Sequence, residues 1–155
     1  MTEADALIAA NTTFYASFSR GDVAQMEALW AERAPISCLH PGWDALLGRE
    51  AVLGSWRAIL RAGAPPIRAS HARALVYGGI GLVLCHEHLG AATLAVTNWF
   101  VIEDGRWKMI CHQAAPIART ASPDDDPADD DDDDADDDNG GAPPPPPSGD
   151  GGMTN

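Results

Sequence analysis

Four polar side chains stand in stretches that are otherwise apolar, and they are the first candidates for chemistry. They are His40, Asn98 and the adjacent pair His112 and Gln113. A polar group buried without a hydrogen-bond partner costs roughly 1–3 kcal/mol, so such a group needs a partner or a function. An imidazole titrates near neutral pH and can accept a proton, and an amide N–H can stabilise a developing oxyanion. We therefore expect His40 to be a general base, Asn98 an oxyanion donor, and His112 a second acid or base or an orienting group.

His40 ends a short apolar run that begins at Ile36 and is typical of a strand. Pro41 and Gly42 prevent the chain from continuing as strand or helix. A helix with an apolar face follows from Arg49. The imidazole is therefore expected at a strand end, at the mouth of a pocket that this helix covers.

Two features of the sequence leave alternatives open. His86 and His88 share one face of an expected strand, and Cys38 and His40 share a face of another. Two such pairs could converge on a zinc ion, but no CxxC or HExxH motif supports this, so we predict a site without metal or other cofactor. Glu87 lies on the face opposite the two histidines, where it could be a pocket acid or an interface charge.

Three amphipathic helices are expected before the sheet. The first covers residues 2–20 and carries one polar residue, Asn11, within its apolar stripe. Asp22 caps the second, and the third spans about 49–62. The apolar faces consist of Leu7, Ile8, Phe14, Tyr15 and Phe18, then Val23, Met26, Leu29 and Trp30, then Val52, Trp56, Ile59 and Leu60.

From residue 67 the hydrophobic period changes to that of strands. Short turns separate the strands, and Asp104-Gly105 is a strong hairpin signal, so the pattern predicts an antiparallel meander. Helices followed by strands predict an α+β fold. The strands are expected at about 67–77, 80–88, 92–103 and 106–115.

The strand at 92–103 is apolar on both faces, since Leu94, Val96 and Phe100 alternate with Ala95 and Trp99. An antiparallel sheet with one face in water would alternate between apolar and polar residues. One face can pack on the helices, but the other also needs cover. A second copy of the chain is the simplest source, which predicts a homodimer packed sheet to sheet.

The charge of the chain is concentrated at its C-terminal end. Residues 1–118 hold ten acidic and nine basic side chains, whereas residues 119–155 hold 13 aspartates and one arginine. A stretch of like charges with nothing apolar to bury is predicted to be a disordered tail. The near-neutral remainder has no electrostatic footprint for nucleic acid.

The cysteines Cys38, Cys85 and Cys111 are odd in number and irregularly spaced, which predicts buried free thiols in a reducing compartment. The sequence shows no signal peptide and no apolar run of the roughly 20 residues that a membrane span needs. We therefore expect a cytoplasmic protein that does not bind membranes.

Several short motifs occur in the order helix, helix, strand, helix and four strands. They are Phe14-Tyr15, Gly21-Asp22, Leu29-Trp30, His40-Pro41-Gly42-Trp43, Gly48-Arg49, Ser55-Trp56, Thr97-Asn98-Trp99-Phe100 and Gly105-Arg106-Trp107. Over residues 1–118 this combination resembles the nuclear transport factor 2-like superfamily, and most closely its SnoaL-like branch. The resemblance implies a cone-shaped half-barrel with three N-terminal helices packed on a curved antiparallel sheet. It does not choose a function, because this fold hosts isomerases, cyclases, dehydratases, binding proteins and association modules.

The ketosteroid isomerases of that superfamily allow a comparison by residue. Where their general base, an aspartate, precedes a proline, this sequence has His40, and Asn98 stands near the place of their aspartic acid oxyanion donor. Phe14 occupies the place of their first-helix tyrosine. Tyr15 is turned about 100° around the helix, so we expect that donor to be lost. These departures argue against steroid isomerisation.

The sequence thus predicts a small-molecule pocket protein, as a cofactor-independent isomerase, cyclase or hydratase or, alternatively, as a non-catalytic ligand-binding or dimeric association domain. A deep pocket with His40 and Asn98 both exposed inside it would favour the enzyme, and a pocket filled by tryptophan side chains would favour the alternative. Five tryptophans favour a small apolar or aromatic ligand. The expected ligand-binding residues are Asn11, Phe14, Phe18, Trp43, Trp56 and Phe100.

Overall fold

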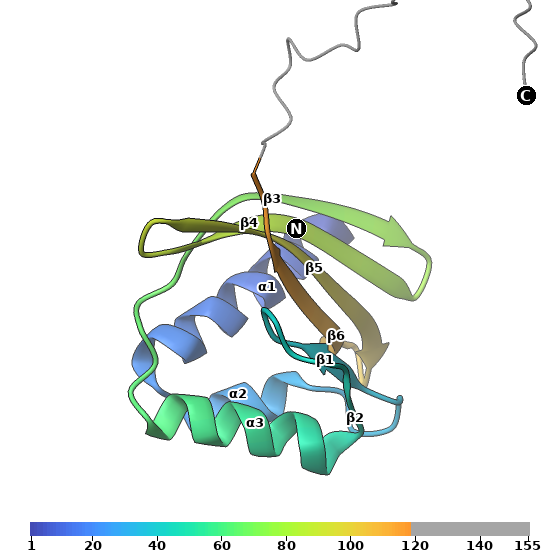
Figure 1. Ribbon diagram of the computed structural model, residues 1–155. Coiled ribbons are helices and arrows are strands. Elements are labelled where there is room, and N and C mark those ends of the chain that lie inside the picture. The colour runs from blue at the N-terminus through green and yellow to red at the C-terminus, as the bar shows by residue number, and fades with distance from the viewer. Residues whose placement is uncertain (119–155) are drawn as a thin grey trace, which may run out of the picture. The chain divides into compact units, whose positions relative to one another are not determined.

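The computed structural model describes residues 1–118 (Figure 1). Three helices precede most of a six-stranded sheet, which confirms the predicted α+β class. The predicted acidic tail, 119–155, lies outside the described residues. The helices are α1 (Glu3–Arg20), α2 (Val23–Leu29) and α3 (Arg49–Arg61), and the strands are β1 (Ser37–Leu39), β2 (Leu46–Leu47), β3 (Arg68–Tyr77), β4 (Ile80–Leu89), β5 (Ala92–Glu103) and β6 (Arg106–Pro116).

Local capping explains where the first two helices begin and end. The Thr2 hydroxyl accepts a hydrogen bond from the Asp5 N–H, and the Asp5 carboxylate accepts one from the Thr2 N–H, which forms a capping box. Gly21 ends α1 with φ of 64°, a left-handed conformation that glycine adopts at little cost. The Asp22 side chain then accepts from the Gln25 N–H and starts α2.

The strand order in the sheet is β2-β1-β6-β5-β4-β3. Strands β3 to β6 form the predicted antiparallel meander. In contrast, β1 pairs in parallel with β6, so that Cys38 lies opposite His112, and β2 was not predicted. A two-residue strand has no readable period, and a pairing between distant strands leaves no local signal. This parallel pairing brings the strand end that carries His40 next to His112.

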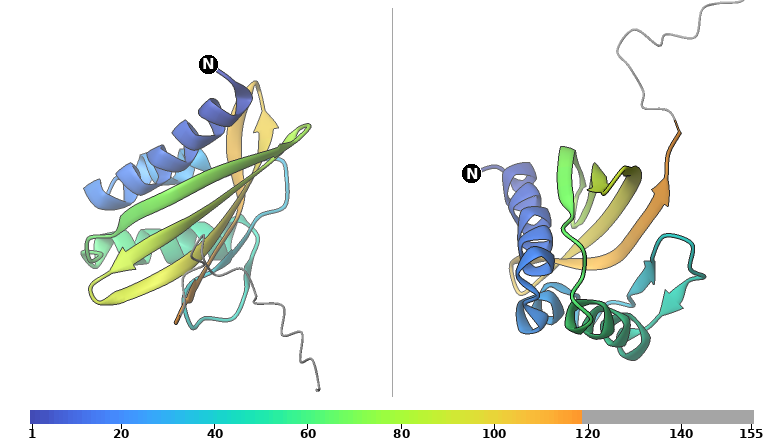
Figure 2. Two further views of the ribbon diagram at one scale, coloured as in Figure 1. Left: turned by 90° about the horizontal axis from the view of Figure 1, so that it is seen from above. Right: turned by 60° about the vertical axis from the view of Figure 1, so that its left-hand side comes forward.

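All three helices lie on the concave face of the curved sheet (Figure 2). Helix α1 packs mainly against β3 and β4, and α3 contacts β1 and β2. Bulges between Ser70 and Arg73 and between Trp99 and Phe100 add local bends to the strands. The predicted half-barrel is confirmed. Its largest fully buried side chains include Trp30, Phe14 and Phe100.

A buried carboxylate ties the segment before β1 to the sheet. Glu103 accepts hydrogen bonds from the backbone N–H groups of Glu32, Arg33 and Ala34, at 2.8, 3.0 and 2.9 Å. These hydrogen bonds hold the pKa of the Glu103 carboxyl below its usual range. They also fix the path of the chain into β1, and thus the position of His40.

Two further expectations concern the cysteines and the membrane. Cys38 and Cys85 are buried free thiols as predicted, whereas Cys111 is only half-buried because it lies on the outer side of the sheet. Within residues 1–118, no helix combines the length and the apolar character needed to cross a bilayer.

The packing of β4 on α1 predicts opposite effects for two glycine-to-alanine substitutions. A Cβ at Gly81 would lie 2.6 Å from a methyl carbon of the fully buried Leu7, so Gly81→Ala should destabilise the fold by about 1–3 kcal/mol. A Cβ at Gly54, inside α3, meets nothing within 4 Å. Gly54→Ala should stabilise by about 0.5–1 kcal/mol. Urea unfolding of both variants measures the two free energies, and equal effects would contradict this packing.

Candidate functional site

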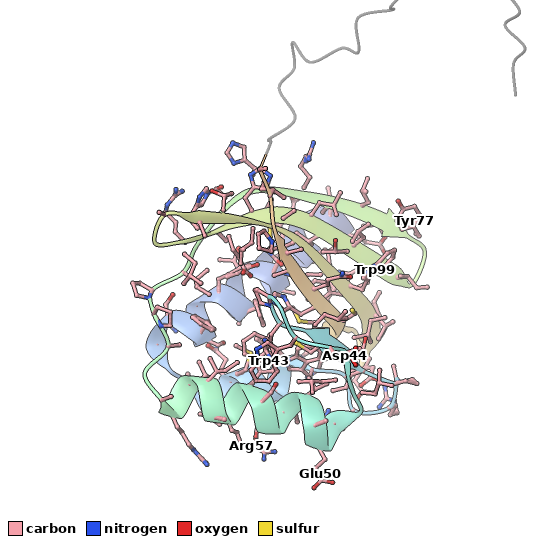
Figure 3. All side chains as sticks on the ribbon, in the orientation of Figure 1. Trp43, Asp44, Glu50, Arg57, Tyr77 and Trp99 are labelled. Carbon is pink, nitrogen blue, oxygen red and sulfur yellow. The ribbon has the colours of Figure 1, made fainter. Side chains whose placement is uncertain are left out.

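A cavity of about 300 Å³ lies between the helices and the concave face of the sheet. Trp43 stands at its mouth, 54% exposed, between α3 and the strands (Figure 3). The tryptophans line the cavity without filling it, and polar groups occur on only part of its wall. The lining consists of Phe14, Tyr15, Phe18, His40, Pro41, Trp43, Trp56, Ile59, Pro65, Ile67, Glu87, Leu89, Leu94 and His112.

A carboxyl and an imidazole meet at this wall. The Tyr15 hydroxyl donates to Oε1 of Glu87 at 2.8 Å, and the same oxygen lies 3.9 Å from Nε2 of His112. Glu87 and His112 are only 3% and 2% exposed. They come from neighbouring parts of β4 and β6, which both flank β5.

A chain of amides behind the wall determines the tautomer of His112. Asn98 donates from Nδ2 to Oδ1 of Asn11 at 2.8 Å, so its own Oδ1 is the acceptor that faces His112 Nδ1 at 2.7 Å. Nδ1 therefore carries the hydrogen. In the neutral ring, Nε2 then has a free lone pair at the cavity wall, as a proton acceptor requires.

Burial drives both members of the pair toward their neutral forms. It raises the pKa of the Glu87 carboxyl, and the hydrogen bond from Tyr15 offsets only part of that rise. Burial lowers the pKa of His112 to about 3, with a smaller contribution from the nearby His40. The pKa of Tyr15 is also raised, mainly by burial and then by the adjacent Glu87. The site thus holds a carboxyl that tends to keep its proton beside an imidazole that is neutral at neutral pH.

His40 lines the cavity as predicted, at the end of β1. Ser55 donates its hydroxyl hydrogen to the Val52 carbonyl oxygen, so it accepts from His40 Nε2 at 2.9 Å, which leaves Nδ1 without a hydrogen. The ring stands edge-on to Trp56, with centroids 4.7 Å apart. Burial lowers the pKa of His40 as well.

The structure divides the predicted site residues into two groups. His40, His112, Phe14, Phe18, Trp43 and Trp56 line the cavity. Asn98, Asn11 and Phe100 are buried behind the lining, and Asn98 is 0% exposed with its amide engaged at both ends. Asn98 therefore meets His112 rather than the cavity, so of the two side chains whose exposure inside the pocket would favour an enzyme, only His40 lies at the cavity.

Two expectations about polar groups need correction. Tyr15 was expected to point away from the cavity, but the curved sheet surrounds α1 closely enough that both Phe14 and Tyr15 reach the wall. Glu87 is the pocket acid, one of the two alternatives that the sequence left open. Glu87 alternates with Val83 and Cys85, which are both buried, and this spacing indicates that its side chain points to the concave face.

The two pairs considered for zinc do not converge. Cys38 and His40 contact each other on the concave side, with Sγ 3.7 Å from Nε2. His86 and His88 alternate with the inward-facing Glu87 and thus lie on the outer face of the sheet. Within residues 1–118, no group of three or more potential ligand side chains is arranged to hold a metal ion.

Comparison with known proteins agrees with this architecture. The sequence model of the SnoaL-like domain matches residues 7–119. A structure from Streptomyces avermitilis, provisionally described as a dehydratase of the NTF2-like family, is 30% identical, with 76% of this chain and 97% of that one covered and a TM-score of 0.68.

Other solved structures resemble the chain with different descriptions. One from Thiobacillus denitrificans, provisionally described as a calcium/calmodulin-dependent protein kinase type II association domain, is 26% identical over 71% of this chain and 94% of that one, with a TM-score of 0.63. An NTF2-like protein from Cytophaga hutchinsonii shares the fold at 16% identity over 76% of this chain and 100% of that one, with a TM-score of 0.62. No protein with a curated description matches the chain.

The raised pKa of Glu87 predicts how stability changes with pH. The unfolded carboxyl ionises near pH 4.3, whereas the folded one stays neutral to higher pH, so its contribution to stability is lost as pH rises through this window. The Glu87→Gln variant has no carboxyl at this position, so its stability does not fall with pH for this reason. Its free energy of unfolding relative to wild type should therefore increase from about pH 4 to pH 8, as measured by urea unfolding.

Glu103→Gln is the matched control, because the pKa of Glu103 is lowered and the sign is reversed. That carboxylate stabilises the fold above its unfolded pKa, and the effect is lost in acid. The free energy of unfolding of Glu103→Gln should thus fall furthest below that of wild type at neutral pH. A pH-independent difference for Glu87→Gln would show that its carboxyl is not held neutral.

Proposed function

The chain belongs to the SnoaL-like domain family, and we propose that it is a cofactor-independent acid–base enzyme that dehydrates or hydrates a small, uncharged carbonyl compound. One observation carries this proposal. A carboxyl and an imidazole with opposite, burial-driven pKa shifts lie 3.9 Å apart at the wall of a largely apolar cavity. The dehydratase description of the Streptomyces avermitilis structure supports the reaction class.

The proposed dehydration needs one base and one acid. Nε2 of His112 removes a proton from the carbon next to the substrate carbonyl, and the neutral Glu87 carboxyl protonates the leaving hydroxyl on the next carbon. A carbon–carbon double bond forms, the carbon–oxygen bond breaks and water leaves. The proton on His112 then returns to Glu87, across 3.9 Å or through the product water, which restores both groups. Hydration is the same sequence in reverse.

The remaining polar residues take supporting roles in this proposal. Asn98 is a positioning residue, because its carbonyl oxygen keeps the hydrogen of His112 on Nδ1. Tyr15 holds Glu87 through its hydroxyl. His40, whose Nδ1 carries no hydrogen and has only the Cys38 sulfur nearby at 3.9 Å, is the alternative base.

The wall chemistry supports an apolar or aromatic ligand with a polar group at one end. Aromatic rings of Phe14, Phe18, Trp43 and Trp56 can enclose a flat ring system. No arginine or lysine is among the lining residues from the described part of the chain. An uncharged ligand is therefore favoured over a carboxylate or a phosphate ester, whose charge would have no partner there.

A non-catalytic association or ligand-binding domain is the second candidate. The 26% identity to a structure described as an association domain favours it. The two candidates differ in what the Glu87 and His112 pair does. In an association domain, substitutions of the pair would change stability but no reaction rate.

A homodimer through the outer face of the sheet also belongs to this proposal. Leu75, Leu82 and Trp99 lie side by side on β3, β4 and β5, with Tyr77 57% exposed nearby (Figure 3). Such an apolar face is stabilised by a second copy of the chain. The free thiols fit a reducing compartment, which supports a cytoplasmic location.

The catalytic proposal is tested with benzylideneacetone hydrate, an aromatic β-hydroxy ketone, as the probe. Dehydration is followed by the absorbance of the enone, and proton removal by deuterium uptake in deuterium oxide, read by NMR. His112→Gln should lower both rates by about a hundredfold or more, because the base is lost. Glu87→Gln should lower dehydration but preserve most of the deuterium uptake.

His88→Gln is the control, because His88 lies on the outer face of the sheet. It should match wild type in both assays. Equal rates for wild type and His112→Gln, or no reaction in wild type above the buffer rate for a panel of such ketones, would favour the association domain.

The proposed dimer is tested by Trp99→Arg, which places a charge at the centre of the apolar outer face. Sedimentation should report a dimer for wild type and a monomer for this variant, with the fold checked by circular dichroism. Leu47→Arg, at the 73% exposed position on β2, should remain dimeric. A monomeric wild type at micromolar concentration would refute the interface.

A further inference from the structure

The outer face of β3 and β4, near the β4–β5 hairpin, carries basic side chains without acidic ones. Strands β3 to β6 hold two carboxylates in all: Glu87 points into the cavity, and Glu103 lies at the opposite end of β5. Thr93, Ala95 and Thr97 of β5, which complete this part of the outer face, are uncharged. The basic side chains are Arg68, His71, Arg73, His86 and His88.

A strained bulge brings two of the histidines together. The register between β3 and β4 shifts between Ser70 and Arg73, and His71 within the bulge has φ of 55°. A residue other than glycine pays about 1–2 kcal/mol for this conformation. The outcome is that the His71 ring lies 5.3 Å from the His86 ring, centroid to centroid.

Hydrogen bonds hold part of this cluster and leave the rest free. The Ser70 hydroxyl lies 2.9 Å from Nδ1 of His71 and 2.7 Å from Nε2 of His88, so it anchors both rings. His71 thus keeps Nε2 free. Within residues 1–118, the imidazole of His86 and the guanidinium of Arg73 take part in none of these bonds.

A separate hollow of about 180 Å³ lies beside these donors. Half of its lining residues are polar or basic, namely His71, Arg73, His86 and Thr97, and the other half are Leu84, Cys85, Ala95 and Val96. Arginine offers a planar fork of donors that matches phosphate oxygens, and protonated imidazoles add charge-assisted hydrogen bonds. Donors from three strands suit a tetrahedral group better than a flat carboxylate.

We propose that this hollow on the outer face of β3, β4 and β5 binds a phosphoryl group, as inorganic phosphate or as the phosphate of a monoester. Arg73 supplies the permanent charge, His71 and His86 supply imidazole donors, and Thr97 supplies a hydroxyl. The site is independent of the proposed reaction, because it lies on the other side of the sheet from the cavity. On that face it adjoins the apolar patch of the proposed dimer, because Arg73 and Thr97 are each two residues from Leu75 and Trp99.

Two further basic groups, Arg68 and His88, face the site from the paired ends of β3 and β4. Burial lowers the pKa of His88, and the charges of Arg68, His86 and His71 lower it further, so His88 acts as a neutral partner of Ser70.

The test is an NMR titration of the full chain with inorganic phosphate at low ionic strength, following the histidine ring signals. The signals of His71 and His86 should shift and saturate, while those of His40 and His112 stay in place. Arg73→Gln should weaken binding about tenfold or more, because one charge-assisted contact is lost. Arg61→Gln, an exposed arginine on α3, should bind as wild type does.

Three further probes define the ligand. Glycerol phosphate that binds as tightly as phosphate would assign the site to phosphate monoesters, and much weaker binding would assign it to free phosphate. Sulfate, which is also a tetrahedral anion, should shift the same two histidine signals and compete with phosphate. Acetate that binds as well as phosphate, a titration that does not saturate, or an Arg73→Gln variant with wild-type affinity would overturn the proposal.

Discussion

A line of three hydrogen-bonded side chains through the core supports the rest of the site. Asn11 on α1, Asn98 on β5 and His112 on β6 are all nearly inaccessible to water, and each buried polar atom among them needs a partner. Their pairing joins the first helix to the centre of the sheet. Because an amide has one acceptor side and one donor side, it also determines which nitrogen of His112 carries the hydrogen. The same two hydrogen bonds thus join the helix to the sheet and set the tautomer of His112.

The curvature of the sheet sets the environment of the candidate site. By wrapping around α1, the sheet removes Glu87, Tyr15 and His112 from water but leaves a hollow in front of them. Desolvation penalises charge of either sign, so the carboxyl becomes a weaker acid and the imidazole a weaker base. A neutral acid and a neutral base can then face the same cavity. In water, the carboxyl would instead pass its proton to the imidazole. Membership of the SnoaL-like family is compatible with this electrostatic arrangement, but the family alone does not indicate a reaction.

The two faces of one strand separate two kinds of chemistry. On β4, Glu87 points into the cavity while His86 and His88 point outward. The side-chain period of two makes this separation strict. The apolar cavity, with no cationic residue among its described lining, and the basic outer hollow therefore differ in the ligands that they would suit. The apolar part of the outer face, around Leu82 and Trp99, is a third surface and suits a second copy of the chain.

The helices, the four long strands, the fold class and the family resemblance could be predicted from the sequence, because apolar periods, helix caps and turn residues act locally. Apolar periodicity also predicted the inward faces of Phe14, Phe18 and Trp56, and Pro41 and Gly42 indicated that the strand ends at His40. The parallel pairing of β1 with β6, the position of Asn98 behind His112, and the approach of Tyr15 and Glu87 to the wall became visible only in the folded chain. Those outcomes depend on contacts between residues up to 87 positions apart and on the burial that such contacts create. Burial in turn sets the protonation of each group, which no local pattern of residues encodes.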